Sequence, residues 1–398
     1  MSDIVVGLFN FWRRRTASFR GTPVASSKPN TVILPARPDD TSDPGLARFE
    51  SSASPLWLLT DEPLVNELVG YLETMRRRIT ADPHGAHGFS FSRAHLVEVR
   101  KAFARMIRRG EEKLHRLCEL LCESYFDSPY TLQNVVIGEV ETTLERFTLV
   151  QPLVPTDLYS HTDLDLGTRQ LRRLRYHDGR RWSRAVLVAN MVEYQPDAPN
   201  AWGIHKFISR IKAEEQIWNK VVDTIFGFDR LVRADKQLRH LGRYVKDVFG
   251  VKAIVGDPDQ ARALHAALQR LAWSSSILDA HGVPMSDATA RMEFIEVKDY
   301  MAQWGRKATG WEAIKSVFRW WDTMIEVQVQ PLTNFHRERE ALTAESHEGF
   351  KARREALRNQ IADRLPLFRF YRDLLRWLFL SPAEPAPTFD SVHIILTD

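Results

Sequence analysis

The stretch Tyr244–Asp257, YVKDVFGVKAIVGD, constrains the fold more than any other part of the chain. Within it, Val251–Val255 is a short, largely apolar and β-branched run closed by a Gly-Asp pair, which predicts a buried strand. A helical pattern with proline in its first turn follows at once over Pro258–Trp273. Asp247 therefore lies at the mouth of a strand that leads into a helix. A carboxylate there can hold a metal ion or serve as an ordinary turn residue.

The composition is that of an ordinary soluble globular protein. The 398 residues are enough for two or three domains, and 44% are hydrophobic and 27% charged. No apolar run reaches transmembrane length, and the N-terminal basic residues follow the apolar part, the wrong order for a secretory signal. The two cysteines, Cys118 and Cys122, are one helical turn apart, so we expect core residues rather than a disulfide. These features favour a cytoplasmic protein.

Arginine is clustered although the formal net charge is only +4. The clusters are Arg13–Arg15, Arg76–Arg78 and the run Arg169–Arg184. Such patches attract phosphate-bearing partners. The alternative interpretation of each cluster is an ordinary solvent-exposed surface with no binding role.

Patterns of hydrophobicity and turn residues divide the chain into four regions. We expect a flexible segment over 1–55, an accessory domain of helices and then β-hairpins over 56–195, a mixed helix and strand domain over 200–351, and a C-terminal helix and tail over 352–398. The expected helices cover 61–80, 92–125, the first part of 202–233, 258–273 and 333–378. The expected strands cover 134–140, 147–154, 172–176, 183–189, 292–297, 311–318 and 324–329. Residues 393–396 are either an edge strand or a segment that docks on a partner.

Four short blocks resemble, in order, the motifs of the RelA/SpoT family synthetase domain, which makes alarmones. The resemblance covers about Phe207 to Lys351. The blocks are Arg210-Ile211-Lys212 with Lys220 downstream, Asp247-Val248-Phe249-Gly250-Val251-Lys252, Lys298-Asp299-Tyr300 followed by Gly310-Trp311, and Glu326-Val327-Gln328-Val329. His347, Phe350 and Lys351 resemble a weaker closing block. Each block alone is weak evidence, and their shared order carries the resemblance.

The resemblance implies an α+β fold in which a mixed β-sheet is flanked by helices, as in nucleotidyltransferases, with helical N-terminal and C-terminal regions. It also implies ATP-dependent pyrophosphoryl transfer to a nucleotide 3′-hydroxyl, with GDP or GTP as acceptor and a (p)ppGpp-type alarmone as product. Such chemistry needs Mg²⁺ and cationic side chains, because negative charge develops on the phosphoryl oxygens. Carboxylates are the protein ligands that Mg²⁺ prefers.

Roles are carried over by position. Asp247 and Glu326 are the expected catalytic residues and Mg²⁺ ligands, and Glu326 is also a candidate to take the proton of the hydroxyl. The expected ATP phosphate-binding residues are Arg210, Lys212, Lys220, Lys252 and Lys298. The expected acceptor-binding residues are Tyr300, Trp311 and Gln328; Trp311 stands where the family has a stacking Tyr.

Several positions depart from the family pattern. Lys252 stands in place of an Arg, which loses bidentate geometry on phosphate. Glu296 reverses the charge of an Arg, and Gln216, Lys315 and Gln330 replace a Ser, a His and an Arg. The two carboxylates expected to bind the metal are kept, whereas several residues expected to bind phosphate or the acceptor differ from the family pattern. Residues 1–200 contain no H-D-x-x-E-D pattern, which is the motif of the family's hydrolase domain.

Three functions therefore remain open. The first is alarmone synthesis on GDP or GTP. The second is that of a toxin-like relative, which pyrophosphorylates the 3′ end of tRNA or an adenosine nucleotide. The third is an inactive nucleotide-binding or interaction module. Oligomeric state stays open as well.

Overall fold

The computed structural model describes residues 62–140, 142–143, 145–177, 182–211, 214–226, 248–302, 311–343, 365–382 and 384–398. The chain divides into two units, Met1–Ser51 and Ser52–Asp398, and every described residue belongs to the second. Within the described ranges, no helix combines the length and apolar character needed to cross a bilayer.

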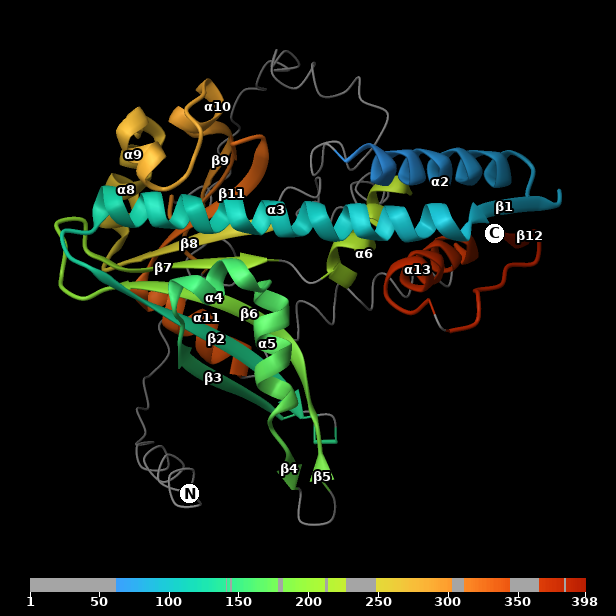
Figure 1. The fold of residues 1–398 in the computed structure, drawn as a ribbon, viewed down its shortest axis with the longest axis horizontal. Helices are drawn as coiled ribbons and strands as arrows, with labels where there is room; N and C mark the ends of the chain where they lie inside the picture. The colour runs from blue at the N-terminus through green and yellow to red at the C-terminus, as the bar shows by residue number, and fades with distance from the viewer. Residues whose placement is uncertain are drawn as a thin grey trace, which may run out of the picture. The chain divides into compact units, whose positions relative to one another are not determined.

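An eight-stranded sheet forms the centre of the described unit (Figure 1). Its strand order is β3-β2-β6-β7-β8-β11-β10-β9. The bounds are β2 Tyr130–Val140, β3 Arg146–Pro152, β6 Ala185–Pro196, β7 Ile204–Ile211, β8 Phe249–Val255, β9 Glu293–Asp299, β10 Ile314–Trp320 and β11 Thr323–Pro331. Strands β8 and β11 are parallel and the other neighbours are antiparallel. The expected mixed sheet is confirmed, and the nucleotidyltransferase-like detail stays a prediction.

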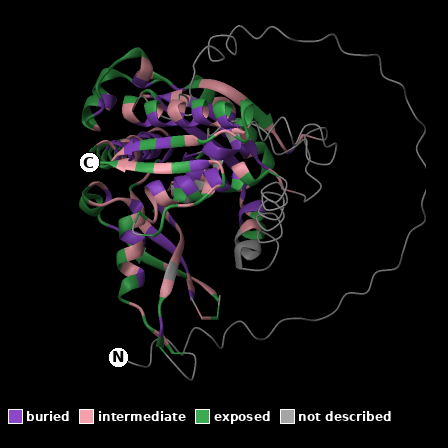
Figure 2. Cartoon of the chain, turned by 90° about the vertical axis from the view of Figure 1, so that its right-hand side faces the viewer, coloured by how far each residue is buried: buried purple, intermediate pink, exposed green. Residues whose placement is uncertain are grey.

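Helices cover both faces of this sheet. The long helix α3 (Arg93–Tyr125) crosses β7 and β8 on one face, which α8 (Pro258–Arg270) also covers farther along (Figure 1). On the opposite face α11 (Leu332–Thr343) packs Phe335 against Ile208 and Ile254. Buried residues concentrate where these layers meet (Figure 2). The sequence sets both helix starts, since Ser92 caps α3 and the Asp257 carboxylate caps α8 through two backbone N–H groups.

The first and last elements of the described chain pack together near the N-terminal end of α3. Helix α2 (Pro63–Ala81) and helix α13 (Pro366–Phe379) lie beside a two-stranded parallel sheet of β1 (His87–Ser92) and β12 (Val392–Thr397). The Tyr371 hydroxyl joins the two helices by donating to the Leu72 carbonyl at 2.7 Å. The edge-strand alternative for residues 393–396 is confirmed, whereas β1 was not predicted.

Smaller elements complete the unit. They are α4 Pro155–Ser160, α5 Asp163–Arg172, the antiparallel pair β4 Tyr176–His177 and β5 Trp182–Ser183, α6 Glu214–Ile225, α9 Ser275–Ala280 and α10 Asp287–Ala290. Helices α4 and α5 were not predicted, and the strand expected over 172–176 is reduced to the two residues of β4. Cys118 and Cys122 are buried and unbonded, as expected. The flexible segment expected over 1–55 lies outside the described residues.

The helix expected at the start of 202–233 is wrong over residues 204–211. These residues form β7, a central strand between β6 and β8, and the helix begins only at Glu214. Pairing on both edges outweighs the helical spacing of Ile208 and Ile211, because every backbone group of a central strand finds a partner. The four-region division stays a prediction, and strands from both 56–195 and 200–351 contribute to the one sheet.

Gly110 lies where α3 packs tightly against the sheet. A Cβ atom at this position would lie 2.1 Å from Cζ of Phe249, a ring that is 2% exposed at the start of β8. We expect Gly110→Ala to lower the free energy of unfolding by about 1–3 kcal/mol through overpacking, although alanine favours helices. Urea denaturation measures the change. Gly70→Ala in α2 is the control, since no atom lies within 4 Å of its added Cβ and a stabilisation of about 0.5–1 kcal/mol is expected.

Candidate active site

Two neighbouring rows of side chains cross one face of the sheet. Residues that are directly opposite in adjacent strands lie on the same face, so the register defines each row. The lysine row consists of Lys298, Lys315, Gln328 and Lys252, on β9, β10, β11 and β8. The glutamate row consists of Glu296, Val317, Glu326, Gly250 and Arg210, on β9, β10, β11, β8 and β7. The rows bring together parts of all four sequence blocks.

Glu326 is the buried centre of the glutamate row, with an exposure of 2%. Its Oε1 accepts a hydrogen bond from Gln328 Nε2 at 2.5 Å and lies 3.7 Å from an Arg210 guanidinium nitrogen. Its Oε2 forms an ion pair with the Lys315 ammonium. Arg210 reaches Glu326 from β7 across Gly250, which has no side chain to intervene. Two cations and one amide therefore fix the orientation of this carboxylate.

A second carboxylate, that of the half-buried Glu338 on α11, contacts Lys252 of the lysine row. Lys252 Nζ bonds its Oε2 at 2.6 Å, and the Trp311 indole N–H donates to its Oε1 at 2.8 Å. Gln330 also donates to Oε2, at 3.1 Å. Sequence reasoning missed Glu338, because one glutamate in the run HREREA is indistinguishable from the charge of a solvated helix face.

Burial and pairing act in opposite directions on this ion pair. Burial lowers the pKa of Lys252, and the Glu338 carboxylate offsets part of that effect. Burial acts to raise the pKa of Glu338, but the Lys252 charge and three hydrogen bonds outweigh it, so the pKa is lowered overall.

Glu338 is therefore expected to make the free energy of unfolding depend on pH in the acidic range. Its pKa is lower in the folded protein than its ordinary value of 4.5, so below that value the unfolded chain binds more protons. The contribution is complete above pH 4.5 and is lost as the pH falls through the folded pKa. Urea denaturation from about pH 6 to about pH 3 should show a steeper loss for wild type than for Glu338→Gln, by up to about 1.4 kcal/mol per pH unit. Equal slopes would contradict this assignment.

Within the rows, Lys298 of the lysine row pairs with Glu296 of the glutamate row. Of the predicted residues outside the rows, Tyr300 and Trp311 have rings that meet edge to face at 5.2 Å. Lys220 lies on α6, and its side chain is outside the described part. Also outside it are Asp247, which directly precedes Val248, and Lys212, together with Gly310, His347, Phe350 and Lys351.

The described residues do not form a Mg²⁺ site by themselves. Both oxygens of Glu326 already bind donors that carry positive charge or an amide, so a cation there would compete with Lys315 and Arg210. Strands β8 and β11 are neighbours, as a shared site between Asp247 and Glu326 requires. Mg²⁺ binding by this pair stays a prediction.

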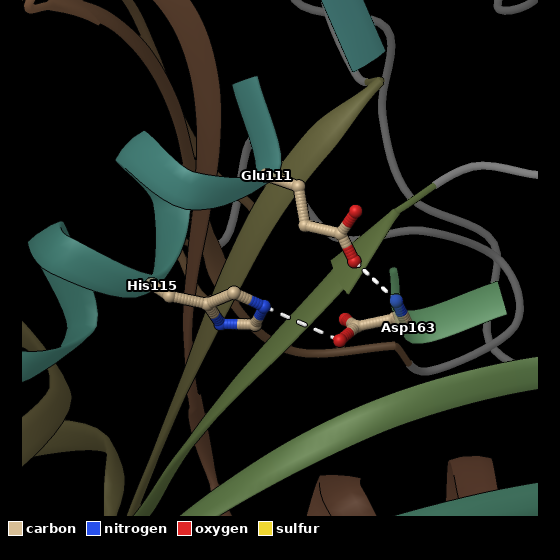
Figure 3. A group of neighbouring side chains, drawn as sticks. All are labelled: Glu111, His115 and Asp163. Carbon is tan, nitrogen blue, oxygen red and sulfur yellow. Dashed lines mark hydrogen bonds and ion pairs between the residues drawn. The ribbon is translucent and has the colours of Figure 1, made fainter. Parts of the chain in front are cut away.

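Another group of potential metal ligands lies away from these rows. Glu111 and His115 on α3 and Asp163 at the start of α5 place one ligand atom each within 4.8 Å of the others (Figure 3). The pKa of Glu111 is raised to about 9, chiefly because the carboxyl group is buried and secondly because the negative charge of Asp163 lies beside it. Glu111 and His115 were not singled out in the sequence, because i,i+4 spacing on a helix is equally typical of core positions, and their partner is distant in the chain.

Comparison with known proteins gives only weak likenesses. No family model and no curated protein matches the chain. Among solved structures, the small alarmone synthetase 1 from Bacillus subtilis is 11% identical over 37% of this chain, with a TM-score of 0.23. The same protein bound to its product pppGpp is 17% identical over 41% of this chain, again with a TM-score of 0.23. The chain spans 64% and 74% of those two structures. At these TM-scores the likeness supports no functional argument.

Proposed function

We propose that this chain transfers a pyrophosphoryl group from ATP to the 3′-hydroxyl of a nucleotide, with GDP or GTP as acceptor and a (p)ppGpp-type alarmone as product. The observation that carries the proposal is the strand register. It places Arg210, Lys252, Lys298, Glu326 and Gln328, which come from four separate sequence blocks, in two adjacent rows on one sheet face. One face of the sheet therefore carries side chains from all four blocks.

The reaction defines what these side chains must do. The acceptor hydroxyl oxygen attacks the β-phosphorus of ATP, the bond from that phosphorus to the bridging oxygen of the α-phosphate breaks, and AMP leaves. Negative charge spreads over the phosphoryl oxygens, and the hydroxyl proton must go to a base. We assign charge stabilisation to Arg210, Lys252 and Lys298, and proton acceptance to the Glu326 carboxylate, which Gln328 and Lys315 hold in place.

A small hollow of about 50 Å³ lies beside the lysine row. It extends from Lys252 and Glu338 towards β2 and β3, and Ile137, Ile208 and Phe335 supply apolar walls. Lys252 and Lys298 are paired with Glu338 and Glu296. ATP therefore has to compete with those two carboxylates.

The test is incubation of the pure protein with γ-labelled ATP and Mg²⁺, with GDP, GTP, ADP, ATP or bulk tRNA as separate acceptors. Label is expected in GDP or GTP products, with AMP formed in equal amount. Transfer to none of these acceptors, with ATP binding retained in calorimetry, would instead support a nucleotide-binding module without activity.

The 3′ end of tRNA is a second candidate acceptor, favoured by the arginines of α5. Arg169, Arg172 and Arg173 line a cavity of about 430 Å³ together with His161. Such a cluster suits a polyanionic backbone, whose binding weakens steeply with salt. A salt-sensitive gel shift with tRNA, lost in Arg169→Ala/Arg172→Ala, together with label in tRNA and none in GDP or GTP, would favour this function over alarmone synthesis.

A further inference from the structure

Glu111, His115 and Asp163 form a buried group where α3 meets the start of α5. Their exposures are 3%, 0% and 1%. Figure 3 shows the two α3 side chains directed at Asp163, which is the first residue of α5. One ligand atom from each lies within 4.8 Å of the others, so small side-chain adjustments bring all three within bonding distance of a single ion.

Hydrogen bonds hold this group in an arrangement typical of metal ligands. The His115 Nδ1 atom lies 2.8 Å from the Tyr194 hydroxyl on β6, which fixes the ring so that Nε2 faces Asp163 Oδ1 at 3.2 Å. A ligating histidine usually has its other ring nitrogen anchored in this way. The Asp163 backbone N–H donates to Glu111, and Asn190 Nδ2 on β6 donates to the Asp163 carbonyl at 2.6 Å.

Two acceptor oxygens of this group are left without a hydrogen-bond partner among the described residues. They are Asp163 Oδ2 and Asn190 Oδ1, on residues that are 1% and 4% exposed. A buried oxygen without a donor is costly, and native proteins rarely tolerate one without a bound water or ion. The unpartnered Asp163 oxygen belongs to the carboxylate that already faces His115.

With both carboxylates ionised, the charge of the group has little compensation within the described part of the chain. Neither Glu111 nor Asp163 forms an ion pair with a lysine or arginine there, and the ion-pair partner of Asp163 among the described residues is His115. Two adjacent buried carboxylates need a cation or a shared proton. A dication would satisfy both carboxylates and the unpartnered oxygen together.

We propose that Glu111, His115 and Asp163 bind one divalent first-row transition metal, of the Zn²⁺ or Mn²⁺ class, which fastens α3 to the start of α5. The imidazole nitrogen favours such an ion over Mg²⁺ or Ca²⁺, which take oxygen ligands. The near-complete burial of all three ligands assigns a structural role. This site is independent of the proposed pyrophosphoryl transfer.

The test uses the tag-free full chain, stripped with a chelator and titrated with Co²⁺ as a spectroscopic probe. We expect visible absorption that saturates at one equivalent, and Zn²⁺ or Mn²⁺ at that ratio by elemental analysis of protein never exposed to the chelator. At about a hundredfold excess over the dissociation constant, the metal should raise Tm by about 5 °C or more.

Two near-isosteric variants separate metal binding from a metal-free hydrogen-bond network. Glu111→Gln keeps an acceptor for the Asp163 N–H and Asp163→Asn keeps the side-chain shape, so both are expected to fold while losing the Co²⁺ spectrum and the metal-dependent Tm shift. Glu119→Gln, on the same helix but paired with Arg116, should retain both. A wild-type chain without stoichiometric metal, or a spectrum that persists in both variants, would overturn the proposal.

Discussion

Glu326→Gln is expected to lower the rate of pyrophosphoryl transfer by about 10²- to 10⁴-fold, the range for loss of a general base. The amide keeps the size of the side chain but cannot take the hydroxyl proton. It also removes the negative charge with which Lys315 and Arg210 pair. Single-turnover assays with labelled ATP measure the loss, and calorimetry should show that ATP still binds.

The matched control for this substitution is Glu293→Gln on β9. Glu293 forms an exposed ion pair with Arg319 in the same sheet, away from the two rows, so its loss should leave the rate within about twofold. An active Glu326→Gln enzyme would remove Glu326 from the chemistry. Equal losses in both variants would point to a general effect on the sheet.

Lys252→Met is expected to lower the free energy of unfolding by about 3 kcal/mol, because it leaves the half-buried Glu338 carboxylate without its cation. This value is the lower end of the range for a buried pair, since the two side chains keep 15% and 25% exposure. Methionine fills the volume of the lysine stem, so the change reports the lost charge rather than a cavity. Urea denaturation at neutral pH measures it.

A second substitution distinguishes the ion pair from simple packing. In Lys252→Met/Glu338→Gln no buried charge remains unpaired, and the glutamine oxygen can still accept from Trp311 or Gln330. The double variant should therefore recover most of the stability lost in Lys252→Met. If the stability lost in the double variant equals the sum of the losses in Lys252→Met and Glu338→Gln, then Lys252 and Glu338 are not energetically coupled.

The sequence predicts the sheet best where a pattern is local. The run Val251–Val255 and the alternation in residues 324–329 both correspond to strands, β8 and β11, and these prove to be neighbours. The Arg210 segment is different. Its apolar spacing fits a helix, and only pairing with β6 and β8, which are distant in the chain, makes it a strand.

The candidate site follows the same division. Lys252, Glu326 and Gln328 could be identified from short blocks, and the register brings them together. Glu338 could not, because its importance comes from burial against Lys252 across 86 residues of chain. The group of Glu111 and Asp163 is likewise invisible locally, since 52 residues separate the two side chains.

The central claim is that two phosphoryl groups of ATP move together, and the position of the label tests it most directly. Parallel reactions with α-, β- and γ-labelled ATP and the preferred acceptor should place the β and γ labels in the product and the α label in AMP. The β label in ADP would indicate a simple phosphotransferase, and the α label in the acceptor would indicate nucleotidyl transfer. Either result would contradict pyrophosphoryl transfer by the two rows around Glu326.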